Sequence, residues 1–103
     1  MTDHVSPPTP SWCPTHPGEL LREDVLPAVG KSKSEIAQLL GISRQHLHDI
    51  LACRKPVSPA TAVRLGKMFG VSAESWLQMQ VKHDAWHAAR DVDVSQIPTL
   101  TAA

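Results

Sequence analysis

Apolar residues recur at helical spacing along most of this chain, and no stretch alternates between apolar and polar positions as a strand would. In the first such stretch, Leu21, Val25 and Ala28 stand at positions i, i+4 and i+7. Pro27 is expected to end or kink that helix early, because proline lacks the backbone N–H. The pattern predicts an all-α fold of five helices, at about 18–28, 33–40, 44–53, 59–69 and 73–90.

Capping residues stand where the predicted helices begin and end. Ser32 and Glu35 have the spacing of a capping box, in which each side chain satisfies a free backbone N–H. Ser43 and Ser58 are N-cap candidates for the next two helices. Gly41 suits the left-handed position that closes a helix. Local start and stop signals therefore agree with the periodicity.

The connection between the second and third helices is only Gly41-Ile42-Ser43. A short turn containing glycine between two short helices is typical of the helix-turn-helix motif. When this motif binds DNA, its second helix lies in the major groove. The sequence thus predicts a recognition helix at about 43–53, with an ordinary helical bundle as the alternative at this point.

Once the apolar side of the recognition helix is assigned to the core, polar side chains remain for the outer face. Arg44 can pair with guanine and Gln45 with adenine, and both stand in the first turn, where a recognition helix reaches base edges. We expect these two residues, with His48 beside them, to contact bases. An ordinary solvated helix face is the alternative.

The charge distribution supports a polyanionic partner. The net charge is zero, but residues 31–67 hold seven Lys and Arg against two acidic residues. Basic and capping residues on either side of the recognition helix are placed to contact phosphates. The predicted phosphate contacts are Lys33, Ser43, Arg54 and Lys55.

A chain of 103 residues has room for one domain. Residues 1–16 are rich in Pro, Ser and Thr and are predicted to form a flexible arm. The helix-turn-helix domain is predicted at 17–90, followed by a C-terminal tail at 91–103.

The predicted fifth helix, about 73–90, carries two apolar stripes on roughly opposite sides. The domain can bury one of them, so the other is expected to meet a second copy of the chain. Two recognition helices would then lie about 34 Å apart, one turn of DNA. The alternative is that Trp86 and its neighbours lie against the N-terminal arm. The residues predicted for the dimer interface are Leu77, Val81, Ala85 and Trp86.

The sequence offers little for catalysis or cofactors. It has no glycine-rich phosphate loop, and Cys53 has no neighbouring base that would activate it. His83 and His87 have the spacing of two ligands on one helix, and Cys13 with His16 has ligand-like spacing, but neither pair has evident further ligands. We therefore expect no enzyme, no metal, no cofactor and no small-molecule substrate. With neither a membrane span nor a signal peptide in the pattern, a cytoplasmic protein with free thiols is expected.

Five blocks of sequence also carry a family resemblance. Together they resemble the HigA antitoxins of the XRE-type helix-turn-helix group over about 16–90, and the first, fourth and fifth blocks are more specific than the helix-turn-helix alone. The blocks are His16-Pro17-Gly18-Glu19-Leu20-Leu21-Arg22-Glu23-Asp24, Ser34-Glu35-Ile36-Ala37, Gly41-Ile42-Ser43-Arg44-Gln45, Val57-Ser58-Pro59-Ala60-Thr61-Ala62-Val63-Arg64-Leu65 and Ser75-Trp76-Leu77-Gln78-Met79-Gln80.

The resemblance implies a five-helix DNA-binding domain that dimerises. It also implies an antitoxin that binds operator DNA, represses its own operon and neutralises a HigB-like toxin, an mRNA endonuclease. Two alternatives stay open: a stand-alone repressor with no toxin, and a toxin-neutralising module that no longer binds DNA.

The chain departs from the family pattern at the end of the recognition helix. Ala52-Cys53 stands where the family usually has a pair such as Asn-Gly, so the loop before Arg54 is expected to take another form. His46 stands where a small residue is common, which suggests a different operator sequence.

Overall fold

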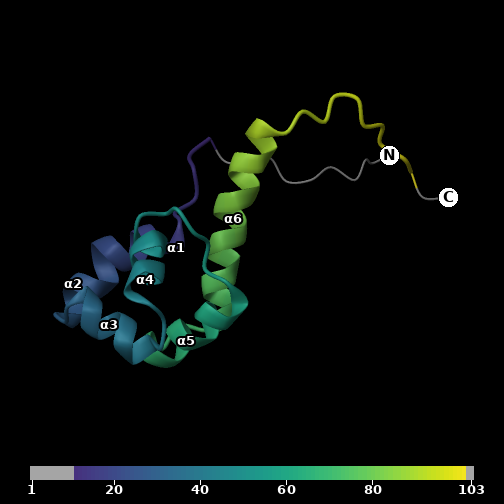
Figure 1. Ribbon diagram of the computed structural model, residues 1–103. Coiled ribbons are helices and arrows are strands. Elements are labelled where there is room, and N and C mark those ends of the chain that lie inside the picture. The colour runs from purple at the N-terminus through teal and green to yellow at the C-terminus, as the bar shows by residue number, and fades with distance from the viewer. Residues whose placement is uncertain (1–10, 102–103) are drawn as a thin grey trace.

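A computed structural model describes residues 11–101 as a bundle of helices with no strand among them (Figure 1). The predicted all-α helix-turn-helix fold is confirmed. Residues 1–10 of the predicted arm and 102–103 of the tail lie outside the described residues. The elements are α1 (Pro17–Leu20), a π-helical turn η1 (Leu21–Val25), α2 (Leu26–Val29), α3 (Lys33–Leu40), α4 (Arg44–Leu51), α5 (Pro59–Phe69) and α6 (Ala73–Asp91).

The first predicted helix is the continuous run α1–η1–α2, and it does not stop before Pro27. The wider π-helical turn lies directly upstream, and the helix continues to Val29. Such turns are one of the ways a helix absorbs an irregularity in its hydrogen-bond ladder. Pro27 therefore does not end the helix; of the two expected effects, only the early end is wrong, and the helix type changes locally just upstream.

The start of α1 is capped by a histidine. His16 Nδ1 accepts a hydrogen bond from the backbone N–H of Gly18 at 2.8 Å, and its ring is buried. Burial and the nearby His83 lower the pKa of His16, which favours the neutral ring that can accept this bond. The first helix is thereby held where it enters the bundle.

The predicted serine caps of α3 and α4 are present. Ser32 Oγ accepts from the Glu35 N–H at 3.1 Å, and the Glu35 carboxylate accepts from the Ser32 N–H at 3.2 Å, which completes the capping box. Ser43 Oγ accepts from the His46 N–H at 2.9 Å. The turn between α3 and α4 begins at Gly41, which has a left-handed φ of 76°.

Helix α4 ends at Leu51, two residues before the predicted end at 53. Cys53 itself takes the left-handed conformation, with φ 60°. Its N–H donates to the Ile50 carbonyl and the Arg54 N–H to the Asp49 carbonyl, so the helix closes with a non-glycine residue in the glycine position. The expectation that the loop takes another form here is wrong.

Each helix contributes one apolar face to a single core. Trp76 at the start of α6 is completely buried and is the largest of these side chains. Leu47, Ile50 and Leu51 form the inner face of α4, as their spacing predicts. The core consists of Leu21, Leu26, Ile36, Ala37, Leu40, Leu47, Ile50, Leu51, Val57, Ala62, Leu65 and Trp76.

Close contacts with the first helix position α4. A Cβ atom built on Gly18 would lie 1.8 Å from the Ile50 carbonyl oxygen, so only glycine permits this approach. From the same helical run, Arg22 Nη1 donates to the Leu51 carbonyl oxygen at 2.7 Å and satisfies the C-terminal end of α4. Arg64 on α5 does the same for the last turn of α3 through the Leu40 carbonyl, also at 2.7 Å. The last turns of α3 and α4 are thus both capped by an arginine that donates a hydrogen bond from another element.

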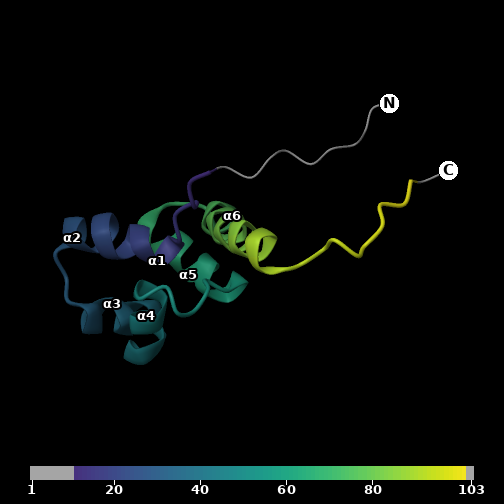
Figure 2. The same ribbon diagram turned by 90° about the horizontal axis from the view of Figure 1, so that it is seen from above.

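Helix α6 runs along one side of the bundle and continues beyond it (Figures 1 and 2). Trp76 is buried, and Met79 and His83 are half-buried, so their stripe faces the bundle. Val81 and Ala85 on the opposite stripe are exposed. After α6, the described part of the tail, 92–101, is exposed throughout.

Candidate nucleic-acid interface

Residues from the start of α3 and from the first two turns of α4 line one surface hollow. Its lining is Lys33 at the start of α3, with Arg44, Gln45 and His48 on the outer face of α4. All four side chains are exposed. The fold therefore brings together the three residues that the sequence assigned to bases and one that it assigned to phosphate. Nothing in the described chain covers them.

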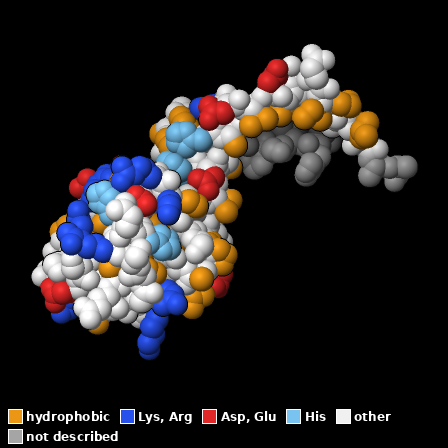
Figure 3. Space-filling view, in the orientation of Figure 1, with side chains coloured by type: hydrophobic (Ala, Val, Ile, Leu, Met, Phe, Trp, Pro, Cys, Tyr) orange, Lys and Arg blue, Asp and Glu red, His pale blue; other side chains and the backbone are white. Residues whose placement is uncertain are grey.

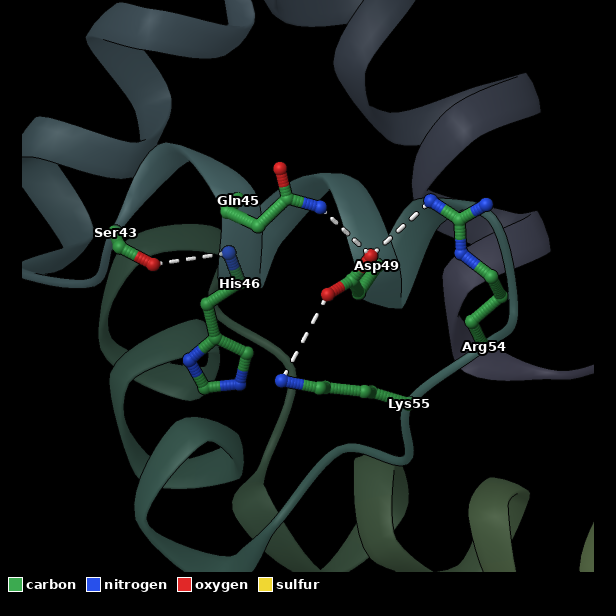
Figure 4. Close-up of polar contacts among 6 residues, drawn as sticks. All are labelled: Ser43, Gln45, His46, Asp49, Arg54 and Lys55. Atoms are coloured by element: carbon green, nitrogen blue, oxygen red, sulfur yellow. Dashed lines mark hydrogen bonds and ion pairs between the residues drawn. The ribbon is translucent and has the colours of Figure 1, made fainter.

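Asp49 organises the polar groups on one flank of this hollow (Figure 4). Its Oδ1 accepts from Gln45 Nε2 at 3.0 Å and from Arg54 Nη2 at 3.1 Å. Its Oδ2 lies 3.7 Å from Lys55 Nζ. One carboxylate thus holds a predicted base contact and two predicted phosphate contacts on the same side of α4.

The Asp49 carboxyl has a lowered pKa. Its partial desolvation acts in the raising direction, and the hydrogen bonds from Gln45 and Arg54 and the charges of Arg54 and Lys55 outweigh it. The group is therefore ionised at neutral pH, and its negative charge stands inside a basic surface.

The N-terminus of α4 opens toward the same surface. Ser43 is exposed, and its Oγ already accepts from the His46 N–H, which leaves the hydroxyl hydrogen available for an external acceptor. His46 is half-buried and lies beside Ser43, the residue that caps the helix. Its side chain is therefore less accessible to a ligand than those of Arg44 and Gln45. The partial positive charge of a helix N-terminus favours a phosphate at this point.

On the face seen in Figure 3, most Lys and Arg side chains lie on the helical bundle, with a few acidic side chains among them, while apolar side chains line the tail beyond α6. One member of the basic stretch serves another purpose, because Arg64 caps α3. The positive surface is therefore concentrated around α4, as the sequence indicates, but not every basic residue is available to a ligand.

The residues predicted for the dimer interface do not lie on one face. Leu77 and Val81 line a shallow hollow with Glu74, Gln78 and Lys82. Trp86 belongs to the opposite stripe, where its ring contacts that of His87 and the Arg90 guanidinium lies 3.5 Å from its centroid. A single helical partner cannot cover Trp86 together with the other three, because helical geometry places Leu77 and Trp86 on opposite sides.

Sequence reasoning missed a buried polar residue that joins α6 to the segment before α5. Gln80 Oε1 accepts from the Val57 N–H at 2.9 Å, and Gln80 Nε2 donates to Asp84 Oδ1 at 2.9 Å. The signal was present, because Gln80 follows Trp76 by one helical turn on the inward stripe. A glutamine there needs a buried partner.

Comparison with known proteins places this architecture in a family. The helix-turn-helix domain family matches residues 19–76, which include most of the first helical run, all of α3, α4 and α5, and the start of α6. The chain belongs to this family. Among curated proteins, virulence-associated protein I of Dichelobacter nodosus is 38% identical over 74% of this chain and 70% of its own length.

Solved structures of antitoxins resemble this helix-turn-helix protein throughout the bundle. The antitoxin GraA in complex with its operator matches with a TM-score of 0.81 and 30% identity over 96% of this chain and all of that one. The Pseudomonas aeruginosa antitoxin HigA with the higBA promoter matches with a TM-score of 0.71 and 33% identity over 82% of this chain and 90% of that one. The resemblance to HigA antitoxins is thereby confirmed.

Among the described residues, no helix combines the length and the apolar character that a bilayer span requires.

Proposed function

We propose that this helix-turn-helix protein is a HigA-like antitoxin that binds operator DNA as a homodimer, represses its own operon and neutralises a HigB-like toxin. The observation that carries the DNA-binding part is the hollow lined by Lys33, Arg44, Gln45 and His48. Two relatives were solved with an operator or a promoter, and both share the arrangement of helices. Double-stranded DNA is therefore the partner that this surface fits best.

The chemistry of each side chain suggests its part in recognition. Arg44 and Gln45 read base edges from the first turn of α4, with His48 one turn later. Gln45 keeps its amide oxygen free for adenine while its Nε2 is bound to Asp49. Lys33 and Ser43 contact phosphates on one side of the groove.

Arg54 and Lys55 contact phosphates on the other side. Both side chains are exposed, and both form ion pairs with Asp49, which restrict their mobility. Ordering these long side chains before binding reduces the entropy lost on the DNA.

A two-fold dimer forms through the outward stripe of α6, with Val81 and Ala85 at its centre and Leu77, which is half-buried against the core, at its edge. Val81 is 63% exposed, so its apolar side chain is accessible to a second copy of the chain. Trp86, on the other stripe, is left out of this interface. A Val81→Asp variant should be monomeric in sedimentation at micromolar concentration, whereas Lys67→Asp, at an exposed lysine on α5 outside the hollow that Leu77 and Val81 line, should remain dimeric. A wild-type protein that stays monomeric on DNA contradicts the dimer.

A binding assay with the DNA upstream of the gene tests the proposed function. Arg44→Ala should cost about 1–3 kcal/mol on the operator and relax its base preference. Lys55→Ala should weaken all duplexes alike and reduce the salt dependence by about one ion. Lys67→Ala, an exposed lysine on α5, is the matched control. Unchanged operator affinity in both Arg44→Ala and Lys55→Ala rules out this use of α4.

Two other functions share the same fold. A stand-alone repressor would lack a toxin partner, and a pure toxin neutraliser would not shift the upstream DNA. The exposed acidic groups Glu19, Glu23 and Asp24 on the first helix suit a basic nuclease, although acidic residues are common near helix N-termini. A neighbouring reading frame for a basic protein of about 90–100 residues, and its co-purification with this chain, distinguishes the antitoxin from the repressor.

A further inference from the structure

Three potential metal ligands from distant parts of the sequence meet on one side of α6. Cys13 lies in the segment before α1, and its Sγ is 3.6 Å from His83 Nδ1 and 3.5 Å from His87 Nε2. The three ligand atoms all lie within 4.8 Å of one another. The histidines stand one helical turn apart, and the sequence separates them from Cys13 by 70 and 74 positions.

The two sulfur–nitrogen distances are those of a tetrahedral site, whereas the two imidazole nitrogens, which lie within 4.8 Å of each other, must move closer when an ion binds. Zinc–sulfur bonds of about 2.3 Å and zinc–nitrogen bonds of about 2.0–2.1 Å, at a tetrahedral angle, place sulfur and nitrogen about 3.5 Å apart. Both sulfur–nitrogen distances agree with this value. Cys13 and His87 are exposed and His83 is half-buried, so an ion can reach the site from solvent.

The Pro14 carbonyl oxygen stands beside the same three groups. It lies 3.4 Å from Cys13 Sγ and 2.9 Å from His83 Nδ1. In the metal-free chain it accepts the Nδ1 hydrogen of His83. When Nδ1 binds an ion, the His83 ring takes its other tautomer and this hydrogen bond is lost. Either the Pro14 carbonyl oxygen or a water molecule then supplies the fourth ligand of the ion.

We propose that Cys13, His83 and His87 bind a zinc-like divalent cation and attach the N-terminal segment to α6. A thiolate with two imidazoles is a donor set that favours Zn²⁺ over Mg²⁺ or Ca²⁺, which prefer oxygen ligands. Binding releases the thiol proton of Cys13 to solvent, because the thiolate is the ligand. The site lies away from the α4 surface, so the inference does not depend on DNA binding.

The fold also explains why this site is not visible in the sequence. His83 and His87 have ligand spacing, but the third group comes from the segment before α1. His16, which is only three residues from Cys13, is committed to capping α1 through its Nδ1. The pairing that sequence spacing suggests, Cys13 with His16, is therefore replaced by one that only the packing of Cys13 and Pro14 on α6 creates.

Titration of the metal-free full-length chain with ZnCl₂ by calorimetry tests the site, with CoCl₂ as a spectroscopic probe. The wild type should bind one ion per chain, and cobalt should show the absorption of tetrahedral coordination with a thiolate charge-transfer band. Cys13→Ser should lose that band and bind Zn²⁺ at least about tenfold more weakly, as expected for the loss of a ligand. His87→Ala should weaken binding similarly.

Cys53→Ser is the matched control, because Cys53 is the other exposed thiol and lies at the end of α4. It should retain both the affinity and the cobalt band. Zn²⁺ should also raise the melting temperature of the wild type but not of Cys13→Ser. Circular dichroism verifies that each variant is folded, and Cys13 is exposed, so its substitution should not disturb the core. Equal zinc affinity in the wild type and Cys13→Ser, or no binding by the wild type, overturns the proposal.

Discussion

The Asp49 carboxylate accepts a hydrogen bond from the Gln45 side chain at 3.0 Å, one turn earlier on the same helix. The same oxygen accepts from Arg54. A negative charge therefore stands in the middle of a surface that we propose binds a polyanion. It holds three cationic or amide groups in place, and it also repels phosphate (Figure 4).

Replacing Asp49 should separate these two effects. In Asp49→Asn the negative charge is removed, and Arg54 and Lys55 lose their ionic partner. Affinity for a scrambled duplex should rise several-fold and its salt dependence should steepen, while operator affinity changes less, so that discrimination falls. Fluorescence anisotropy at several salt concentrations measures both. Asp91→Asn at the end of α6 is the control, and unchanged binding to scrambled DNA contradicts the argument.

The buried amide of Gln80 should contribute to stability. Gln80→Ala removes the acceptor for the buried Val57 N–H, and an unsatisfied buried donor costs about 1–3 kcal/mol. Gln78→Ala on the exposed side of the same helix should change the free energy of unfolding by less than about 0.5 kcal/mol. Chemical denaturation measures both, and similar small effects would mean that water replaces the Gln80 contact.

The end of α4 should be stabilised by glycine. Cys53 has φ 60°, which is unfavourable for a residue with a Cβ atom, so Cys53→Gly should increase the free energy of unfolding by about 0.5–1 kcal/mol. Ala52 has φ −82° and ψ 3°, which alanine adopts without strain, so glycine at this position only increases the conformational entropy of the unfolded chain. Ala52→Gly should therefore destabilise the protein by a similar amount. Thermal unfolding of the two variants should shift in opposite directions.

The capping box of α3 should make stability depend on acid pH. The hydrogen bond from the Ser32 backbone, followed by that from its side chain, lowers the pKa of Glu35 below its ordinary value of 4.5. The ionised form therefore stabilises the fold above the unfolded pKa, and this contribution is lost as the pH falls through the folded pKa. Glutamine can also form a capping box but does not titrate.

The stability difference between wild type and Glu35→Gln isolates that contribution. The difference should be constant near pH 7. As the pH falls below about 4.5, the unfolded pKa, the wild type should lose stability relative to Glu35→Gln. Denaturation at a series of pH values from 7 to 3 provides the measurement. A difference that does not vary with pH would show that the Glu35 carboxylate is not held by Ser32.

Much of the fold is encoded locally and could be predicted from the sequence. The helices follow from apolar spacing, and the starts of α3 and α4 follow from Ser32 and Ser43, whose bonding partners lie three residues away. The outward position of Arg44 and Gln45 follows from the burial of Leu47 and its neighbours on the same helix. Periodicity and capping need no information from the rest of the chain.

Tertiary structure decided what depends on distant parts of the chain. Arg22 and Arg64 look like ordinary surface cations in the sequence, but each caps a helix more than twenty positions away. The choice between the two stripes of α6, and the meeting of Cys13 with His87, also depend on how the elements pack. Such contacts are set by the geometry of the assembled bundle, where a single close approach such as that of Gly18 to Ile50 determines which side chains meet.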